Sequence, residues 1–332
     1  MQDKIWNKLL EFETRDLASR YMDDRHNRKA SANQILGITS NFIQGREYFR
    51  NAKSASITVR PLLQYYGVTA LTRGLILLTN PKLSESALKP AHGLETINWQ
   101  EALVKKNFDQ LQVRITNGTF YELLEGTANK SYFRHNSSGV NYKLPFDIPK
   151  LNSQIKFIDL IQTLPDFKEE FEIWSQVKLN HLLLKSIKTN EKSYQFKIEQ
   201  TKDFDSSTSK IFPQNVLLNI DPENQLINSK LGFIPQFSQK FADPFNANIG
   251  TIALTRPISG SIYLNTIAQF YVLSYFLGML SRYFPSIWIS IGRTEKGDAI
   301  YPLITKIMDS IDLYFPYVIN EYLIGPYPFE IH

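Results

Sequence analysis

The residues best suited to chemistry in this chain are an arginine and a histidine six positions apart, Arg20 and His26, in the segment RYMDDRHN. Histidine transfers protons near neutral pH, because its ordinary pKa lies close to physiological pH. Arginine stabilises the negative charge that develops on a reacting phosphate. The pair therefore predicts either phosphate chemistry or a solvated cluster at a helix end, where basic side chains complement the helix dipole.

The spacing Arg-x5-His is similar to the Arg-x4–6-His motif of the HEPN class of helical ribonucleases. This resemblance implies a metal-independent ribonuclease, in which Arg20 stabilises charge on the phosphate and His26 transfers protons to and from the ribose oxygens. That class usually builds its active site at a dimer interface. The alternative interpretation, a surface cluster that ends a helix, stays open at the level of the sequence.

A second pair of candidates is Arg60 and His92. Arg60 opens the segment VRPLLQYYGVTALTRGLILL (59–78), which predicts an apolar, nearly enclosed helix. A helix N-terminus disfavours a cation, and a desolvated charge needs a partner. We therefore expect Arg60 to pair with a carboxylate or with carbonyl groups of another helix. The alternative is an open pocket shared with His92.

His92 lies in KPAHGLE, just after a loop with two prolines. It is a candidate catalytic base, or it fixes a turn through hydrogen bonds. No nucleophile or metal partner is visible near it in the sequence. The remaining histidines are His135 and His181, which are isolated, and His332, which is the last residue.

The composition excludes several kinds of site. The chain has no cysteine, so disulfides, thiolate zinc sites and cysteine nucleophiles are excluded. Five scattered histidines predict no zinc site, and no phosphate-binding or dinucleotide-binding glycine motif is present. No G-x-S-x-G elbow occurs either. We therefore expect no metal and no cofactor, and we favour a protein that is not an enzyme.

Charge and hydropathy limit the choice of partners. The formal net charge of +5 over 332 residues is compatible with a nucleic-acid partner, and equally with a slightly basic solvated surface. The N-terminus lacks the apolar core of a signal peptide. The segment Ile262 to Leu280 approaches the length of a membrane span, but it carries Asn265 and Gln269. We expect a buried helix, no membrane and a cytoplasmic location.

The periodicity of apolar residues predicts helices in the N-terminal part. Ser31 is placed to cap a helix that runs to about Ala52, and Thr58 is placed to cap the apolar helix that ends at Asn80. Gly67, Ala70 and Gly74 would form one stripe on that helix. Small residues on one line predict close approach of another helix.

The middle of the chain predicts strands. LQVRI (111–115) alternates and leads to Asn117-Gly118, a turn signal. A helical insert covers 155–175. VKLNHLLLKSI and SYQFKIEQ predict a hairpin, and NVLLNI, KLGFIP and GTIALTRP predict further strands. The segments HNSSGVNYKLPFDIP and TKDFDSSTSK predict exposed loops.

The C-terminal part predicts helices again. One covers about 263–284, and another begins near Asp298 and is kinked or ended by Pro316. The predicted class is therefore α+β, with N- and C-terminal helices packed as one mainly helical unit and a β-rich middle subdomain. We divide the chain into an N-terminal helical region (1–107), a β-rich region with a helical insert (108–257) and a C-terminal helical region (258–332).

Several blocks of the sequence resemble the bacterial YaaC-like family. In chain order, these blocks are FETRDLASRYMDDRHN, FIQGREYFRNAKSA, VRPLLQYYGVTALTRGLIL, AHGL and MLSRYFPSIW. The blocks lie in the N-terminal third and the C-terminal fifth of the chain. The resemblance implies a bacterial cytosolic protein, and it implies no activity and no catalytic residue.

These observations support three hypotheses about function. The first is a non-enzymatic interaction or scaffold subunit of a bacterial assembly, linked to nucleic-acid processing or phage defence. It is favoured by aromatic residues clustered near the C-terminus, which predict a protein partner or a homo-oligomer. The second is the ribonuclease that uses Arg20 and His26. The third is a nucleic-acid-binding protein without catalysis.

Overall fold

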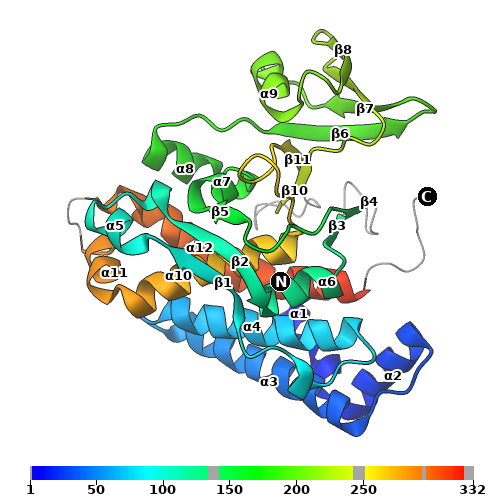
Figure 1. Cartoon of the computed structure of the whole chain (residues 1–332), viewed down its shortest axis with the longest axis vertical. Helices are drawn as coiled ribbons and strands as arrows, with labels where there is room; N and C mark the ends of the chain where they lie inside the picture. Colours follow the sequence, from blue (N-terminus) through cyan, green and yellow to red (C-terminus); the bar gives the residue numbers. More distant parts are fainter. Residues whose placement is uncertain (1, 134–141, 242–250, 294–296, 325–332) are drawn as a thin grey trace.

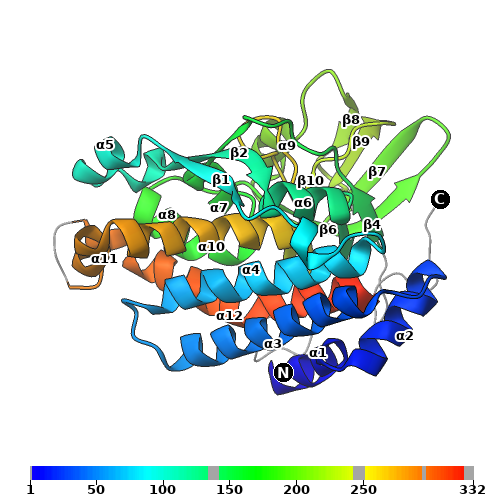
Figure 2. The same ribbon diagram turned by 60° about the horizontal axis from the view of Figure 1, so that its bottom comes forward.

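The computed structural model describes residues 2–133, 142–241, 251–293 and 297–324 (Figure 1). Helices from the two ends of the chain lie side by side, and the strand-rich middle lies on one side of them (Figures 1 and 2). The predicted α+β class is confirmed, and so is the single helical unit made from the N- and C-terminal helices. His135 and His332 lie outside the described residues.

The helical unit is built from four long helices and several shorter elements. Its long helices are α3 (Ala32–Ser54), α4 (Arg60–Thr79), α10 (Thr266–Tyr283) and α12 (Tyr301–Ile324). Its shorter elements are α1 (Gln2–Leu9), η1 (Leu10–Glu13), α2 (Arg15–His26), η2 (Glu85–Ala87), α11 (Pro285–Ile291) and η5 (Asp298–Ile300).

Side chains cap two of these helices. The Ser31 hydroxyl accepts a hydrogen bond from the Gln34 N–H at 3.2 Å and begins α3, as the sequence predicted. The Asn265 side chain accepts from the Ala268 N–H at 2.8 Å and begins α10. The predicted cap of α4 is wrong: its N-cap is Val59, not Thr58, and no side chain caps that end.

Glycines allow the central helices to approach closely. A Cβ atom on Gly74 would lie 2.7 Å from the Phe42 ring of α3, and one on Gly67 would lie 2.8 Å from the Phe49 ring. On α10, a Cβ atom on Gly278 would lie 2.8 Å from Tyr65 of α4. The stripe of small residues on α4 therefore receives α3, which packs along it (Figure 2).

The prediction that Pro316 ends or kinks the last helix is wrong as to its ending, because α12 continues through Pro316 to Ile324. A proline removes one helical hydrogen bond, here the bond to the carbonyl of Asp312. Pro316 is buried, and α12 packs against α4 and α10, so tertiary packing outweighs that cost. Among the described residues, no helix is long and apolar enough to cross a membrane.

A three-stranded antiparallel sheet lies against the helical unit. Its order is β1 (His92–Ile97), β2 (Gln112–Gly118) and β5 (Gln154–Lys156). The hairpin turn predicted at Asn117-Gly118 is wrong, because β2 runs to Gly118 and continues directly into α6 (Thr119–Gly126). Gly118 instead allows two backbone segments to approach closely, because a Cβ atom on it would lie 2.6 Å from the Ala91 carbonyl oxygen.

A six-stranded antiparallel sheet forms the far side of the molecule, in the order β10-β11-β6-β7-β9-β8. Its strands are β6 (Leu182–Thr189), β7 (Ser193–Ile198), β8 (Leu217–Asp221), β9 (Leu226–Lys230), β10 (Gln236–Lys240) and β11 (Thr251–Thr255). The predicted hairpin is confirmed as β6 and β7. The predicted strand KLGFIP is wrong, because the chain turns there, between β9 and β10.

The segment TKDFDSSTSK is not a loop, because α9 (Phe204–Ile211) covers most of it. Phe204, Thr208 and Ile211 recur at helical spacing and are buried against the six-stranded sheet. Part of the other predicted loop, HNSSGVNYKLPFDIP, lies outside the described residues. Its remainder contains β4 (Tyr142–Pro145), which pairs with β3 (Lys130–Phe133).

The remaining elements are short helices, of which the last three lie within the predicted helical insert (155–175) and the first two precede it. They are α5 (Trp99–Val104), η3 (Phe108–Gln110), α7 (Phe157–Ile161), η4 (Pro165–Phe167) and α8 (Lys168–Ser175). Their apolar side chains join the main core with the helical unit and the three-stranded sheet. A second, smaller core lies under the six-stranded sheet.

A buried polar network links the beginning of α10 to the middle region. The Asn265 side chain donates to the Thr127 hydroxyl at 2.8 Å, and its N–H donates to the Asn129 side chain at 2.9 Å. Asn129 in turn donates to the carbonyls of Asp147 and Tyr263, both at 2.9 Å. Because these groups are buried and paired, they fix how the helices and the strands meet.

Candidate functional site

Arg60 is held by two carboxylates of α12. Its Nη2 donates to Asp312 Oδ2 and to Asp309 Oδ1, both at 2.6 Å, and its Nε donates to Asp312 Oδ2 at 3.1 Å. The Arg60 side chain is 20% exposed and that of Asp312 10%, whereas that of Asp309 is 61% exposed. Arg60 therefore joins the first turn of α4 to the middle of α12. The two carboxylates are the negative partners that we expected for a cation at the start of a helix.

Burial and charge act in opposite directions on this pair. Burial lowers the pKa of Arg60, but the charges and hydrogen bonds of Asp312 and Asp309 outweigh burial, so the net pKa is raised. Burial raises the pKa of Asp312, although Gln64 and Arg60 favour its ionised form.

Arg60 also lines an open cavity of about 500 Å³ at this end of the helical unit. The cavity lies between α1, the second half of α3, the start of α4 and α12. Its lining residues are Trp6, Arg46, Phe49, Arg50, Lys53, Arg60, Asp309, Asp312 and Leu313. His92 is not among them, so the structure does not bring Arg60 and His92 into one pocket.

His92 belongs to a cluster of tyrosines at the start of β1. Its Nδ1 shares a hydrogen bond of 2.6 Å with the hydroxyl of Tyr65, which is fully buried on α4. The Tyr271 hydroxyl of α10 donates to the His92 carbonyl at 2.9 Å, and the Tyr275 hydroxyl donates to the Leu94 carbonyl at 3.0 Å. The cluster ties β1 to two helices of the unit.

The environment of His92 keeps its ring neutral. Burial lowers its pKa, and the positive charge of Arg282 lowers it further. Burial also raises the pKa of Tyr271 to about 12, so this hydroxyl stays protonated and able to donate. A neutral histidine that is hydrogen-bonded to buried tyrosines makes the start of β1 rigid.

Arg20 and His26 lie on different sides of α2. Residues six positions apart on an α-helix point in directions about 120° apart, so the two side chains diverge. Arg20 is exposed. The His26 Nε2–H donates to the Leu78 carbonyl at 2.7 Å, in the last turn of α4, where carbonyl groups lack helical partners.

Comparison with known proteins gives one result. A family model described as YaaC-like protein matches residues 10–323 of the chain. The chain belongs to the YaaC-like family. No curated protein and no solved structure matches it.

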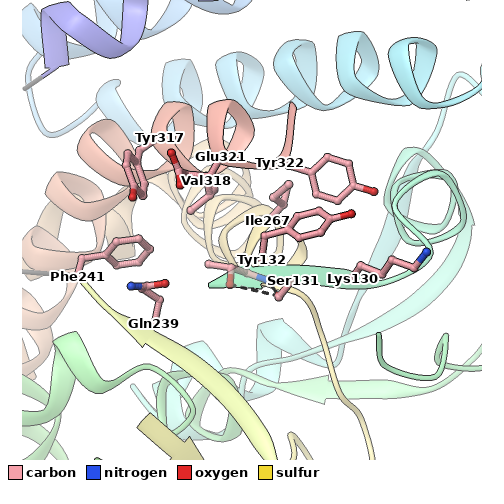
Figure 3. A pocket seen from close by; sticks show the side chains of 11 residues that line it. Lys130, Ser131, Tyr132, Gln239, Phe241, Ile267, Tyr317, Val318, Glu321 and Tyr322 are labelled. Carbon is pink, nitrogen blue, oxygen red and sulfur yellow. Dashed lines mark hydrogen bonds between the residues drawn. The ribbon is translucent and has the colours of Figure 1, made fainter. Parts of the chain in front are cut away.

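In this YaaC-like protein, a narrow cleft marks the seam between the helical unit and the strands. Figure 3 shows α12 side chains facing β3 and the end of β10. The cleft has a cavity volume of about 20 Å³, which is room for a water molecule or two. Tyr322 and Tyr132 pack across it with ring centroids 5.1 Å apart, and the Tyr322 hydroxyl donates to the Thr127 carbonyl. The cleft is too small for an organic ligand.

A second open cavity, of about 430 Å³, lies where α7 and β5 meet α9 and the loop after β11. Lys156, Lys210 and Arg256 line it, and Asp159 pairs with Arg256 at 3.5 Å. This basic cleft was not predicted from the sequence. Its cations lie tens of residues apart along the chain, so no local pattern marks them.

The other walls of the Arg60 cavity were not predicted from the sequence either. Arg46, Arg50 and Lys53 recur at helical spacing on α3, and Asp309 and Asp312 are three residues apart on α12. These spacings indicate one helix face each, but they do not indicate that the faces meet. Among the described residues, no group of three or more acidic or histidine side chains is placed to hold a metal.

Proposed function

We propose that this chain is a non-enzymatic interaction subunit of a bacterial cytosolic assembly. The observation that supports the proposal is that the three histidines in the described part of the chain all serve the fold. His26 and His181 each donate from Nε2 to a backbone carbonyl, at 2.7 and 2.9 Å, and His92 is bonded to a buried tyrosine at 2.6 Å. Each ring is committed to holding two segments of the fold together.

An exposed apolar strip supports a protein partner. Leu36 is 57% exposed and Ile43 is 42% exposed on α3. Seven residues separate them, so they lie about 20° apart on the same side of the helix. Figure 2 shows α3 on the outer side of the helical unit. Exposed apolar surface marks interaction sites when it is contiguous, so the partner would have to cover this side of α3 between the two residues.

Association can be tested by size-exclusion chromatography with light scattering. We expect the protein to form a dimer or larger complex, alone or mixed with the products of adjacent genes. The double variant Leu36→Glu/Ile43→Glu should abolish formation of this complex. Val104→Glu is the matched control, because Val104 is an isolated exposed apolar residue on α5. A strict monomer at micromolar concentration in every mixture would contradict the proposal.

The ribonuclease hypothesis stays a prediction, and the divergence of Arg20 and His26 does not favour it. It requires that purified protein cleave RNA without metal and that His26→Ala abolish cleavage without loss of thermal stability. We expect intact RNA, and we expect His26→Ala to lower the melting temperature because the α4 carbonyl loses its partner. Metal-independent cleavage that depends on His26 would replace the interaction proposal.

Nucleic-acid binding is the second candidate, and the basic cleft with Lys156, Lys210 and Arg256 favours it. Binding through phosphate contacts weakens steeply as salt rises, because counterions are released. Filter binding of single-stranded RNA at 50 and 200 mM salt should then differ by about 10-fold for two or more contacts. Affinity that is unchanged by Lys210→Ala/Arg256→Ala would exclude the cleft.

A further inference from the structure

We infer that the cavity lined by Arg60 binds a free ribonucleoside phosphate. This inference does not depend on the proposed interaction role. The cavity has a volume of about 500 Å³, which lies within the range of small-molecule sites. It offers cations, an aromatic ring and a carboxylate within one hollow, and a nucleoside phosphate has a complementary group for each.

The cations would receive the phosphate. Arg46, Arg50, Lys53 and Arg60 line the cavity against Asp309 and Asp312, which leaves an excess of two positive charges in the lining. Glu13 and Glu47 stand outside the lining and pair with Arg46 and Arg50. Arginine binds phosphate oxygens through paired N–H groups, so two or three of these side chains suffice for one phosphate.

Two of the arginines are held in place before any ligand arrives. Glu13 accepts from Arg46 Nε and Nη2 at 2.8 and 2.9 Å, which is a bidentate pair. Asp312 and Asp309 accept from Nε and Nη2 of Arg60, which leaves its Nη1 without a protein partner among the described residues. Fixed donors lose little conformational entropy on binding.

Trp6 would receive the base. It is partly buried on α1, and its ring lies 5.6 Å from that of Phe49, centroid to centroid. Phe49 is itself stacked on Phe315 of α12, so the aromatic wall is supported from behind. A partly exposed indole ring stacks with any base, because every base has a π-face.

Asp309 would receive the ribose. Its carboxylate is 61% exposed and accepts one hydrogen bond from Arg60, so further lone pairs point to solvent. Carboxylates accept hydrogen bonds from ribose hydroxyls in nucleotide sites. Inorganic phosphate would use only the cations, and a nucleoside only the ring and the carboxylate, so the whole cavity fits the combined molecule.

Isothermal titration of the full chain tests the inference, with AMP, GMP, CMP and UMP as probes and tryptophan fluorescence as a second readout. We expect at least one to bind saturably and to quench Trp6. The variant Arg50→Ala/Lys53→Ala should weaken that binding about 10-fold or more by loss of charged hydrogen bonds. Trp6→Leu should weaken it and remove the quenching.

The matched control is Lys105→Ala/Arg114→Ala, which removes two exposed cations that belong to ion pairs elsewhere. It should leave binding unchanged, and melting temperatures should show that every variant folds. No saturable binding of any of the four nucleotides up to millimolar concentration would overturn the inference.

Two other outcomes would also overturn it. Equal affinity for inorganic phosphate and for the nucleotides would reduce the cavity to a simple anion site. Tighter binding of a single-stranded RNA, lost in the same variants, would show that the cavity holds a nucleic-acid chain instead of a free nucleotide.

Discussion

At the scale of single residues, Arg60 shows how one helix position restricts what a side chain can do. A cation in the first turn of a helix opposes the helix dipole, so it requires negative partners. Asp312 and Asp309 provide them, and both belong to α12. The same arginine lines the cavity, so its structural pairing and a ligand contact are compatible.

Asp312→Ala should destabilise the protein more than Asp309→Ala. Removal of Asp312 leaves a largely buried guanidinium with only an exposed partner, so we expect a loss of about 1–3 kcal/mol in the free energy of unfolding. Removal of the exposed Asp309 should cost less than about 1 kcal/mol. Urea denaturation measures both, and combination with Arg60→Met isolates the coupling energy. Equal losses for the two variants would contradict this account of the pair.

Asp166 in η4 predicts a dependence of stability on pH. Burial raises its pKa to about 7, although a hydrogen bond from the Phe241 N–H and the charges of Lys240 and Lys306 favour the ionised form. Because the folded pKa lies above the unfolded one, the stability from this group is complete below pH 4. It is lost as the pH rises to about 7.

Asp166→Asn should remove that dependence. Between pH 4 and pH 8, the free energy of unfolding of the wild type should fall by about 4 kcal/mol relative to the variant, because the folded pKa of about 7 lies far above the ordinary value of an aspartate. His181, whose pKa burial lowers to about 4, acts in the opposite sense, but it is present in both proteins and cancels in the difference. Parallel pH profiles of the two proteins would show that the Asp166 carboxyl is not desolvated.

At the scale of elements, the packing of α3 on α4 is decided by glycines that face aromatic rings. The space above Gly74 is occupied by the ring of Phe42, and the space above Gly67 by that of Phe49. Alanine would improve helix propensity at either position, by about 1 kcal/mol. The steric clash of the added Cβ atom with the phenylalanine ring opposes this gain in helix propensity. The ring is packed in the core, so it cannot move without displacing its neighbours.

Gly74→Ala should therefore destabilise the protein, by about 1–2 kcal/mol after the gain in helix propensity. Gly292→Ala is the matched control, because the nearest atom to a Cβ there would lie at 3.6 Å, an ordinary contact. Thermal unfolding of both variants measures the difference. A stabilised Gly74→Ala protein would mean that α3 and α4 are free to separate.

At the scale of the whole molecule, a buried polar seam joins the helical unit to the middle region. Asn265, Asn129 and Thr127 connect the start of α10 to the strands, and Tyr322 of α12 reaches the same network. Buried polar groups are specific in their geometry, because an unpaired group is costly. The seam therefore sets the angle between the helical unit and the middle region, which apolar contacts alone would leave less defined.

Some errors of the sequence analysis arose where tertiary contacts outweighed local signals. Asn117-Gly118 has the composition of a hairpin turn, but Gly118 is required by the approach of Ala91. TKDFDSSTSK is as polar as a loop, yet most of it belongs to α9. One side of that helix is buried through Phe204, Thr208 and Ile211. Pro316 stays within α12 because it is buried in a helix that packs against α4 and α10.

The sequence by itself determined the helices at both ends, the hairpin of β6 and β7, the N-cap at Ser31 and the family. These features follow from the periodicity of apolar residues, from helix capping and from blocks of sequence, all of which are local properties of the chain. It also determined that Arg60 needs a negative partner. Only the tertiary structure decided that this partner is Asp312, 252 residues away, and that three basic residues of α3 face the same cavity. The physical reason is that helix faces are encoded locally, whereas which faces meet depends on how the whole core packs.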